Sequence, residues 1–259
     1  EPLLRRNVES LIESIVAHGT IDDLSLTSNG THFPRLAKRL KEAGLSRITL
    51  SLDSLDRENF RKITGRDGLD DVLESIRLAK ALGLTPVKVN AVIIRGLNDH
   101  EIGALAHFAV QKNIVMRMIE FMPLDSGRAW QREHVVPGSE ILERVQAEIP
   151  VAPLPAQHAA ETASRWSLGD GQAELGIVAP VTQPFCGQCS RIRLTADGHI
   201  RTCLFSVHEH DLKPSLRDDS GDDELVAELQ RIVWKKEPGH QIGQPGFVQP
   251  ERSMSGIGG

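Results

Sequence analysis

Aromatic residues are scarce in this chain of 259 residues: they make up 4% of it, and tyrosine is absent. Few aromatic rings leave few platforms on which the bases of single-stranded nucleic acid can stack. The formal net charge of -5 also gives no general attraction for nucleic acid. No apolar run approaches the length of a membrane span, and no signal-peptide pattern opens the chain. We therefore expect neither a nucleic-acid nor a membrane partner.

Cysteine is also rare, and its three copies lie close together as Cys186, Cys189 and Cys203, in the pattern C-x2-C-x13-C. An odd number of cysteines at metal-ligand spacing indicates a reducing cytoplasm and not a disulfide framework. Gly187 permits the bend that lets two thiolates of a CxxC pair reach one centre. The pattern predicts a strand at 191–194, a turn at 196–198 and a returning strand at 199–205. This hairpin would bring Cys203 back beside the pair.

Three thiolates suit two kinds of metal centre. A structural zinc ion takes four ligands, so it would also need a histidine such as His208 or His210. A 4Fe-4S cluster held by three thiolates keeps one iron open to an outside ligand, and spacing alone favours neither centre. Arg191 and Arg193 alternate with Ile192, so both would point to one face and hold phosphates or carboxylates there, which favours the cluster. A solvated strand edge is the other interpretation of such an arginine pair.

Strand, loop and helix alternate along the first half of the chain. An amphipathic helix opens the sequence, and Asp99 is placed to cap a helix that runs through Val110. The alternation predicts a parallel sheet with right-handed crossovers and a functional site at the carboxyl ends of its strands. The predicted strands are 23–26, 47–52, 86–94 and 114–121, and the helices between them are 32–42, 57–63 and 69–82.

After Pro123 this alternation stops. The pattern then predicts a helix at 139–147, a proline- and alanine-rich linker at 150–162, and two strands at 162–168 and 174–179 that lead to the cysteine hairpin. A helix follows at 224–236. The tail, 237–259, is rich in glycine and proline and has no periodicity, which is typical of disorder.

Seven stretches of the sequence, in order along the whole chain, resemble the GTP 3',8-cyclase family, the molybdenum cofactor biosynthesis protein A family of radical S-adenosylmethionine enzymes. The cysteine segment and the double-glycine end are specific to this family within its superfamily. The stretches are EPLLR at 1–5, LTSNG at 26–30, ITLSLDSLD at 48–56, VKVNAVIIRGLND at 87–99, RMIEFMPL at 117–124, PVTQPFCGQCSRIRLTADGHIRTCLF at 180–205 and RSMSGIGG at 252–259.

This resemblance implies a fold and a reaction. The fold would be α/β: an incomplete (β/α)6-type radical SAM TIM-like barrel over 1–124, and a carboxyl-terminal α+β cluster-binding domain over 125–259. Such enzymes use two 4Fe-4S clusters. The first cleaves S-adenosylmethionine to a radical that abstracts hydrogen from the ribose 3' carbon of GTP, and the second binds GTP. The new carbon radical attacks purine carbon 8, giving 3',8-cyclo-7,8-dihydro-GTP in the first step of molybdenum cofactor biosynthesis.

The resemblance also implies roles for the residues of the cysteine segment. Cys186, Cys189 and Cys203 match the ligands of the second cluster. Arg191, Ile192 and Arg193 match a segment that contacts GTP, and the two arginines match catalytic positions. Gly258 and Gly259 match a tail that enters the active site, where a lack of side chains permits close approach.

Further roles fall on residues at the strand ends. Thr27, Lys88 and Arg117 match GTP-binding positions, whereas Ser51 and Met122 match positions that contact S-adenosylmethionine. Four of them also have a purely structural interpretation. Thr27 can form hydrogen bonds in a turn, Ser51 can end a strand, Met122 can pack in the barrel core, and Lys88 can lie on a solvated face.

The sequence departs from the family in one large respect: it lacks the CxxxCxxC motif of the first cluster. We therefore interpret the chain as a fragment that holds at most the GTP side of the reaction. The resemblance implies a cytoplasmic monomer or homodimer, a reductant such as flavodoxin or ferredoxin, and transfer of the product to cyclic pyranopterin monophosphate synthase. Two other functions are alternatives to this interpretation. The chain could be a non-catalytic binding module stabilised by zinc, or another radical S-adenosylmethionine enzyme with an auxiliary cluster.

Overall fold

Seven strands form one sheet in the computed structural model, which describes residues 1–125, 127–218 and 221–257. The strand order is β1-β2-β3-β4-β7-β6-β5; pairing is parallel from β1 to β7 and antiparallel for β7-β6 and β6-β5. The strands are β1 (Ser25–Ser28), β2 (Arg47–Ser51), β3 (Lys88–Ile93), β4 (Val115–Glu120), β5 (Val151–Leu154), β6 (Ser164–Leu168) and β7 (Ala173–Val178).

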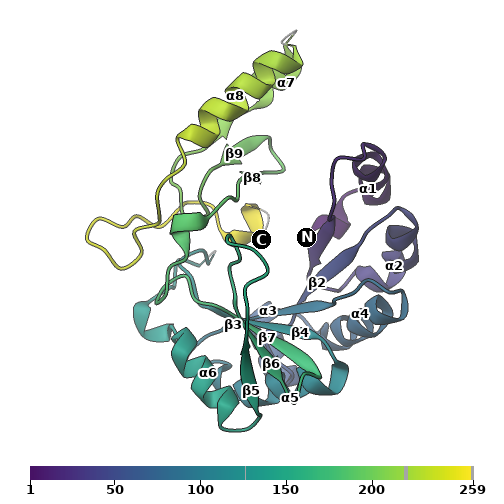
Figure 1. The fold of residues 1–259 in the computed structure, drawn as a ribbon, viewed down its shortest axis with the longest axis vertical. Coiled ribbons are helices and arrows are strands. Elements are labelled where there is room, and N and C mark those ends of the chain that lie inside the picture. Colours follow the sequence, from purple (N-terminus) through teal and green to yellow (C-terminus); the bar gives the residue numbers. More distant parts are fainter. Residues whose placement is uncertain (126, 219–220, 258–259) are drawn as a thin grey trace. The chain divides into compact units, whose positions relative to one another are not determined.

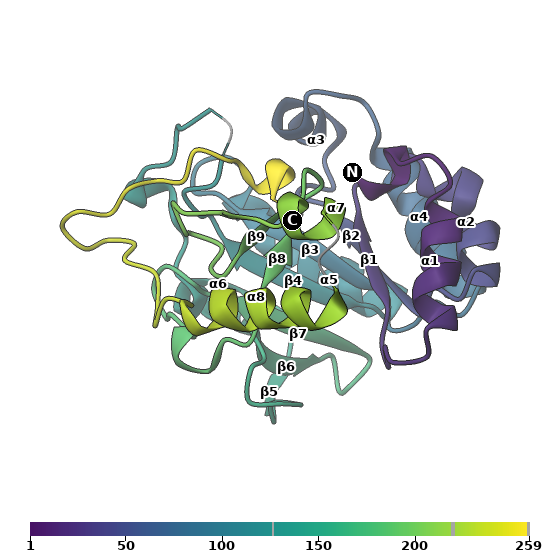
Figure 2. The same cartoon turned by 90° about the horizontal axis from the view of Figure 1, so that it is seen from above.

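Helices cover one face of this sheet. Side chains in a strand alternate between its two faces, and in β3 Val89, Ala91 and Ile93 join the helices in one core while Lys88 and Asn90 lie on the opposite face. Figures 1 and 2 show α1, α2 and α4 along the same side of β1 and β2. The helices are α1 (Val8–Ala17), α2 (Phe33–Glu42), α3 (Arg57–Thr64), α4 (Leu69–Ala81), α5 (Ile102–Lys112) and α6 (Gly138–Gln146).

The described residues divide into two compact units. Unit 1 comprises Glu1–Glu120, Val136–Ala156 and Ala163–Ala179, so it holds the whole sheet. Unit 2 comprises Phe121–Val135, Gln157–Thr162 and the described residues from Pro180 onward. The boundary predicted after residue 124 stays a prediction. Residues 163–179 lie in unit 1 because β7 pairs with β4 in the sheet.

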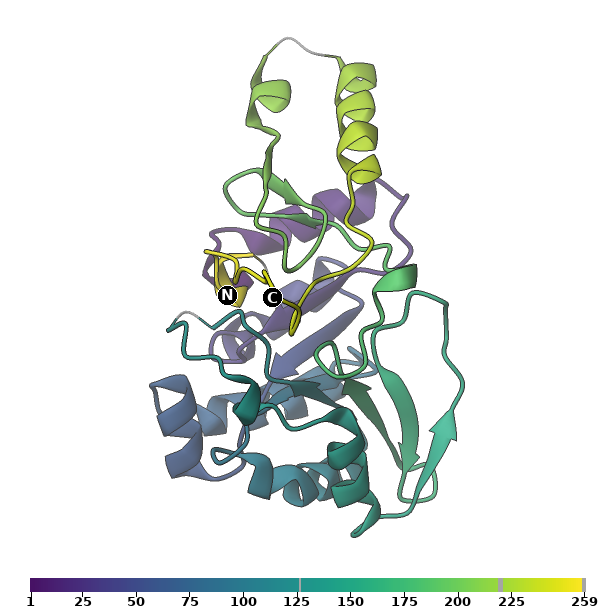
Figure 3. The ribbon, with the colours of Figure 1, turned by 90° about the vertical axis from the view of Figure 1, so that its left-hand side faces the viewer.

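Unit 2 contains a three-stranded antiparallel sheet in the order β10-β9-β8. The described tail is not disordered: Ile242 and Ile257 are buried in a core with Leu124, Val181 and Phe205. Figure 3 shows α7 and α8 side by side beyond the small sheet. The elements are β8 (Arg193–Leu194), β9 (His199–Arg201), β10 (His210–Asp211), α7 (Lys213–Arg217) and α8 (Asp222–Trp234).

The predicted fold class is confirmed, with an α/β unit built on a mostly parallel sheet and a separate small antiparallel sheet. Two local predictions are wrong. The predicted linker contains strand β5, because Pro153 is tolerated at the edge of a sheet. Asp99 does not cap α5: it lies in a 3-10 turn, Asp99–Glu101, and its Oδ1 accepts a hydrogen bond from Gly96 N at 2.7 Å.

Short 3-10 turns complete the secondary structure of the described ranges: Pro2–Leu4, Asp99–Glu101, Arg132–His134, Cys186–Gln188 and Met254–Gly256. Within those ranges, no helix has both the length and the apolar character that crossing a membrane requires.

Candidate functional site

The face of the large sheet opposite the helices carries a row of polar side chains. Parallel pairing aligns Ser51 of β2 with Asn90 of β3, and Asn90 with Arg117 of β4. One step earlier, Thr27 of β1 aligns with Thr49 of β2, which aligns with Lys88 of β3. Residues in register on parallel strands point to the same face, so Thr27, Lys88, Ser51 and Arg117 share it. Four residues predicted from separate stretches of sequence are thus brought together.

Sequence reasoning missed the residue at the centre of this row. Asn90 lies between Ser51 and Arg117, and its buried Oδ1 has no hydrogen-bond partner among the described residues. A buried acceptor without a partner is costly unless a ligand or water satisfies it. Its position two residues after Lys88 in the stretch VKVNAVIIRGLND was the available signal. Asn90 therefore joins the candidate ligand-binding residues.

A glycine on the neighbouring strand makes room for the arginine of this row. Gly176 of β7 is paired with Arg117, and a Cβ atom at position 176 would lie 3.2 Å from Cγ of Arg117 and 3.2 Å from Cβ of Ala163. Such contacts are tighter than ordinary van der Waals packing. The absence of a side chain at Gly176 thus lets the stem of Arg117 lie close to β7.

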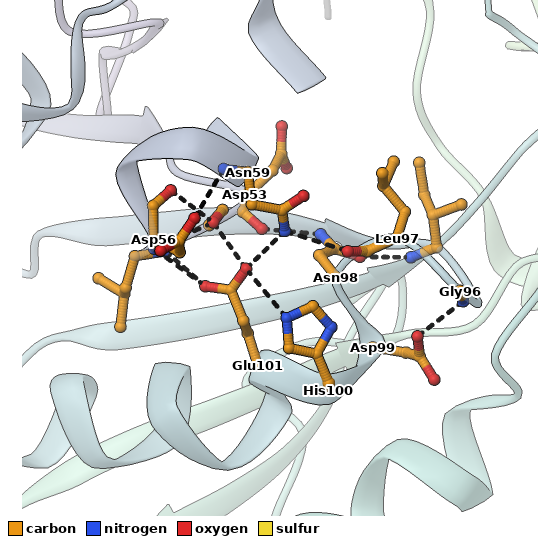
Figure 4. Close-up of polar contacts among 12 residues, drawn as sticks. Asp53, Asp56, Asn59, Gly96, Leu97, Asn98, Asp99, His100 and Glu101 are labelled. Atoms are coloured by element: carbon orange, nitrogen blue, oxygen red, sulfur yellow. Dashed lines mark hydrogen bonds and ion pairs between the residues drawn. The ribbon is translucent and has the colours of Figure 1, made fainter. Parts of the chain in front are cut away.

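A buried carboxylate fixes the loop that follows β2. Glu101 is 6% exposed, and it accepts hydrogen bonds from Ser54 Oγ at 2.6 Å, Leu55 N at 2.7 Å and Asn59 Nδ2 at 2.7 Å (Figure 4). Burial acts to raise the pKa of Glu101, but these hydrogen bonds, with one from Asp56 N, hold it below the ordinary glutamate value. The loop after β3, which carries Glu101, is therefore bound to the loop after β2.

Asn98 strengthens the same link, as Figure 4 shows. Its side-chain amide donates to the carbonyl oxygens of Asp53 and Val92 at 2.7 and 2.8 Å, and its Oδ1 accepts from Ile94 N at 2.7 Å. Asp53 Oδ1 accepts from Val92 N at 2.8 Å. Burial raises the pKa of Asp53 to about 6, although the hydrogen bond from Val92 opposes the rise. Ser51 thus ends its strand beside a loop that is fixed on both sides.

The cysteine segment lies in unit 2, and two of its predicted features need correction. The strand predicted at 191–194 is limited to Arg193–Leu194, so strand alternation does not place Arg191 on the face of Arg193. The strand predicted at 199–205 ends at Arg201. Cys203 lies in the turn that follows, and its carbonyl accepts a hydrogen bond from Ser206 N at 3.2 Å. The buried side chain of Arg201 binds carbonyl groups of this turn, which holds the turn in place of a longer strand. Cys186 begins a 3-10 turn that Cys189 closes.

The arginines lie close to the sulfur atoms. Arg191 donates from Nε and Nη2 to Cys189 Sγ at 3.4 and 3.3 Å, and its guanidinium lies 5.3 Å from the ring centre of Phe185. Arg193 Nε is buried and has no hydrogen-bond partner among the described residues. Burial lowers the pKa of Arg193 and the charge of Arg191 adds to this, whereas Cys189 and Cys203 oppose it. A half-buried guanidinium with an unused donor is suited to bind an anion.

The thiols are in different electrostatic surroundings. Burial raises the pKa of Cys203, against a hydrogen bond from the backbone of Phe205 and the charge of Lys236. Burial acts in the same direction on Cys189, but hydrogen bonds and positive charge from Arg191, with the charge of Lys236, lower its pKa. Cys189 is therefore the more readily ionised of these two thiols.

The donor set of the cysteine segment consists of three thiols. All three cysteines are free thiols, the ligand type that iron-sulfur clusters require. Within the described ranges, no group of three or more His, Cys, Asp and Glu side chains is arranged to hold a metal ion. A structural zinc ion would need a fourth ligand besides these thiols, so the choice between a cluster and zinc stays a prediction.

Two predicted site elements lie elsewhere. Met122 belongs to unit 2, where it packs against the core that contains Leu124 and Phe205, so its predicted contact with S-adenosylmethionine stays a prediction. Gly258 and Gly259, the predicted tail of the active site, lie outside the described residues.

Comparisons with known families match two successive stretches of the chain. Residues 1–109 match the radical SAM superfamily. Residues 114–242 match the family described as Molybdenum Cofactor Synthesis C. The chain therefore contains a radical SAM domain, and membership of this superfamily implies a 4Fe-4S cluster and S-adenosylmethionine.

Relatives named GTP 3',8-cyclase match the chain over its whole length. The relative from Corynebacterium glutamicum is 43% identical, and the match covers 100% of this chain and 71% of the relative. Those from Streptomyces coelicolor and Mycolicibacterium smegmatis are each 42% identical over 100% of this chain, and over 76% and 73% of their own lengths. The chain belongs to the GTP 3',8-cyclase family, as the sequence motifs predict.

A solved structure of TYW1 with a bound lysine-pyruvate adduct is 17% identical, covers 61% of this chain and 50% of its own, and has a TM-score of 0.46.

Replacement of Glu101 by alanine should destabilise unit 1. The change leaves Ser54 Oγ, Leu55 N and Asn59 Nδ2 without their shared acceptor. We expect a loss of roughly 2–4 kcal/mol in the free energy of unfolding, measured by urea denaturation. Glu58→Ala, at an exposed position of α3, is the control. An equal effect of the two substitutions would contradict the anchoring role of Glu101.

The pKa of Asp53 predicts a pH-dependent difference between the wild type and Asp53→Asn. The folded-state value of about 6 lies above the ordinary 3.8, so Asp53 contributes stability below about pH 4 that is lost as pH rises through 6. Urea denaturation from pH 4 to 8 should show the wild type losing up to about 3 kcal/mol relative to the variant. Parallel stability curves for the two proteins would show that Asp53 ionises normally.

Proposed function

We propose that this chain carries the GTP-binding side of a GTP 3',8-cyclase, which converts GTP to 3',8-cyclo-7,8-dihydro-GTP in molybdenum cofactor biosynthesis. The observation that carries the proposal is the buried, unpartnered Nε of Arg193 beside the thiols of Cys189 and Cys203. A cation with a free donor next to a set of metal-ligating sulfurs is suited to an anionic substrate bound at a metal centre. Family membership supplies the identity of that substrate.

The cysteine segment would hold the second cluster and orient the nucleotide. Cys186, Cys189 and Cys203 would each bind one iron, and a 4Fe-4S cluster held in this way offers its fourth iron to an outside ligand. Arg191 lies against Cys189, so its outer guanidinium nitrogens and those of Arg193 would bind the charged groups of GTP. Partial burial of Arg193 limits the access of water and strengthens this contact.

The polar face of unit 1 carries further residues that the family resemblance assigns to ligand binding. Lys88 and Arg117 supply positive charge for phosphate oxygens, and Thr27 supplies a hydroxyl group. Ser51, at the end of a strand beside the loops bound to Glu101, would contact S-adenosylmethionine, and the resemblance assigns the same ligand to Met122. When bound, S-adenosylmethionine and the first cluster supply the 5'-deoxyadenosyl radical that abstracts hydrogen from GTP.

The proposal also includes a cellular location, further contacts with the nucleotide, and partner proteins. Three free thiols are typical of a reducing compartment, so we place the protein in the cytoplasm. Ile192, exposed between the two arginines, would contact the nucleotide, and Gly258 and Gly259 would enter the active site. A flavodoxin or ferredoxin would supply electrons to a monomer or homodimer, and cyclic pyranopterin monophosphate synthase would receive the product.

Metal content tests the nature of the centre. After anaerobic reconstitution with iron and sulfide, we expect about four irons per chain and a broad absorbance at the blue end of the visible spectrum. Cys203→Ala removes one ligand and should abolish most of both signals. One zinc per chain and no colour would contradict the cluster and favour the zinc-stabilised module.

Nucleotide binding tests the role of the arginines. In the reconstituted chain, the double substitution Arg191→Ala and Arg193→Ala should weaken GTP binding by roughly 100-fold or more, because two charge-assisted contacts are lost. Anaerobic calorimetry measures the dissociation constant. Arg217→Ala, at an exposed position in the same unit, should leave it unchanged. Unaltered GTP affinity in the double variant would exclude the proposed site.

A further inference from the structure

Lys236 joins the two arms of the cysteine segment. Its ammonium group donates to the carbonyl oxygen of Arg191 at 2.9 Å and also to the carbonyl oxygen of Thr202. Arg191 follows Cys189 by two residues, and Thr202 directly precedes Cys203. One side chain thus binds the backbone of the arm that carries the CxxC pair and the backbone of the arm that carries the third cysteine.

The position of Lys236 is itself fixed. Its backbone N donates to the carbonyl of Val233 at 3.0 Å, which ties it to the last turn of α8. The next residue, Glu237, accepts a hydrogen bond from Thr202 Oγ1 at 2.6 Å, so Thr202 is held by its side chain as well as by its carbonyl group. Thr202 is 3% exposed. The two arms are therefore attached to the end of a helix and not only to each other.

Strand pairing alone fixes the arms weakly. β8 and β9 pair over two residues each, Arg193 with Arg201 and Leu194 with Ile200, and both cysteine turns lie outside this ladder. Two-stranded pairing of this length is marginal by itself. The contacts of Lys236 lie between the ladder and the cysteines, where a change in the spacing of the arms would move the sulfur atoms most.

We propose that Lys236 is a positioning residue that sets the separation of Cys203 from the Cys186–Cys189 pair and the placement of Arg191. This inference rests on the proposed function, since the cluster and GTP give the separation its purpose. The ammonium group also adds one positive charge to the cysteine segment. Its removal should therefore change geometry and charge together.

The chain offers a matched control at the neighbouring position. Lys235 is exposed, and its side chain makes no hydrogen bond with the residues that the structure describes. Lys235→Met and Lys236→Met remove the same charge and leave similar side chains at adjacent positions. Only the second removes the link between the arms. Lys236→Arg keeps the charge and the donors, so it should restore the wild-type properties.

Three measurements on the whole chain test the inference. In cluster-free protein, a short bifunctional maleimide should cross-link Cys203 to Cys186 or Cys189 several-fold less often in Lys236→Met than in Lys235→Met. In reconstituted protein, Lys236→Met should bind GTP about tenfold more weakly, as expected for loss of charge-assisted hydrogen bonds. The midpoint potential of its cluster should shift to more negative values, because a nearby positive charge is lost.

The outcomes separate this inference from the proposed function. If wild-type protein takes up iron and binds GTP, but Lys236→Met behaves as Lys235→Met in all three measurements, the inference is overturned and the proposed function stands. If wild-type protein neither forms the cluster nor binds GTP, the proposed function fails. Should Lys236→Met not fold, as judged by circular dichroism, Lys236→Gln is used in its place. Failure of Lys236→Arg to restore cross-linking and GTP affinity would likewise contradict a positioning role.

Discussion

The register of the parallel strands is the constraint on which the polar face of unit 1 depends. Pairing of Ser51 with Asn90, and of Asn90 with Arg117, places side chains from three distant stretches of sequence in one row. A shift of one residue in any of these strands would turn its polar set into the core and its apolar set out. Buried residues such as Val89 and Met116 on the helix-covered face therefore hold the site in place as firmly as direct contacts do.

The cysteine turns of unit 2 have little regular structure around them, so strand register cannot fix their positions. Cationic side chains hold these turns in place: Arg201, which is buried, binds the turn after β9, and Lys236, which is half-buried, binds both arms. Positive charge near several thiols also lowers the cost of gathering thiolates in one place. Structure and electrostatics thus depend on the same side chains here.

The sequence predicts the broad architecture well because strand and helix periodicities are strong and local. It predicts the polar strand ends through family resemblance, and the register then shows why Thr27, Ser51, Lys88 and Arg117 belong together. Strand β5 was missed because its proline argues against a strand unless the strand is known to lie at an edge.

The contacts of Glu101 and Lys236 were beyond prediction for a different reason. Their partners lie more than thirty residues away in sequence, at Ser54, Leu55, Arg191 and Thr202, and no local pattern encodes such pairs. The close approach of Gly176 and Arg117 is another contact between residues that are far apart in sequence. Gly176 of β7 has no side chain, and this is what lets the stem of Arg117 lie close to that strand. Added bulk at position 176 would therefore displace the stem of Arg117, although Gly176 itself supplies no functional group.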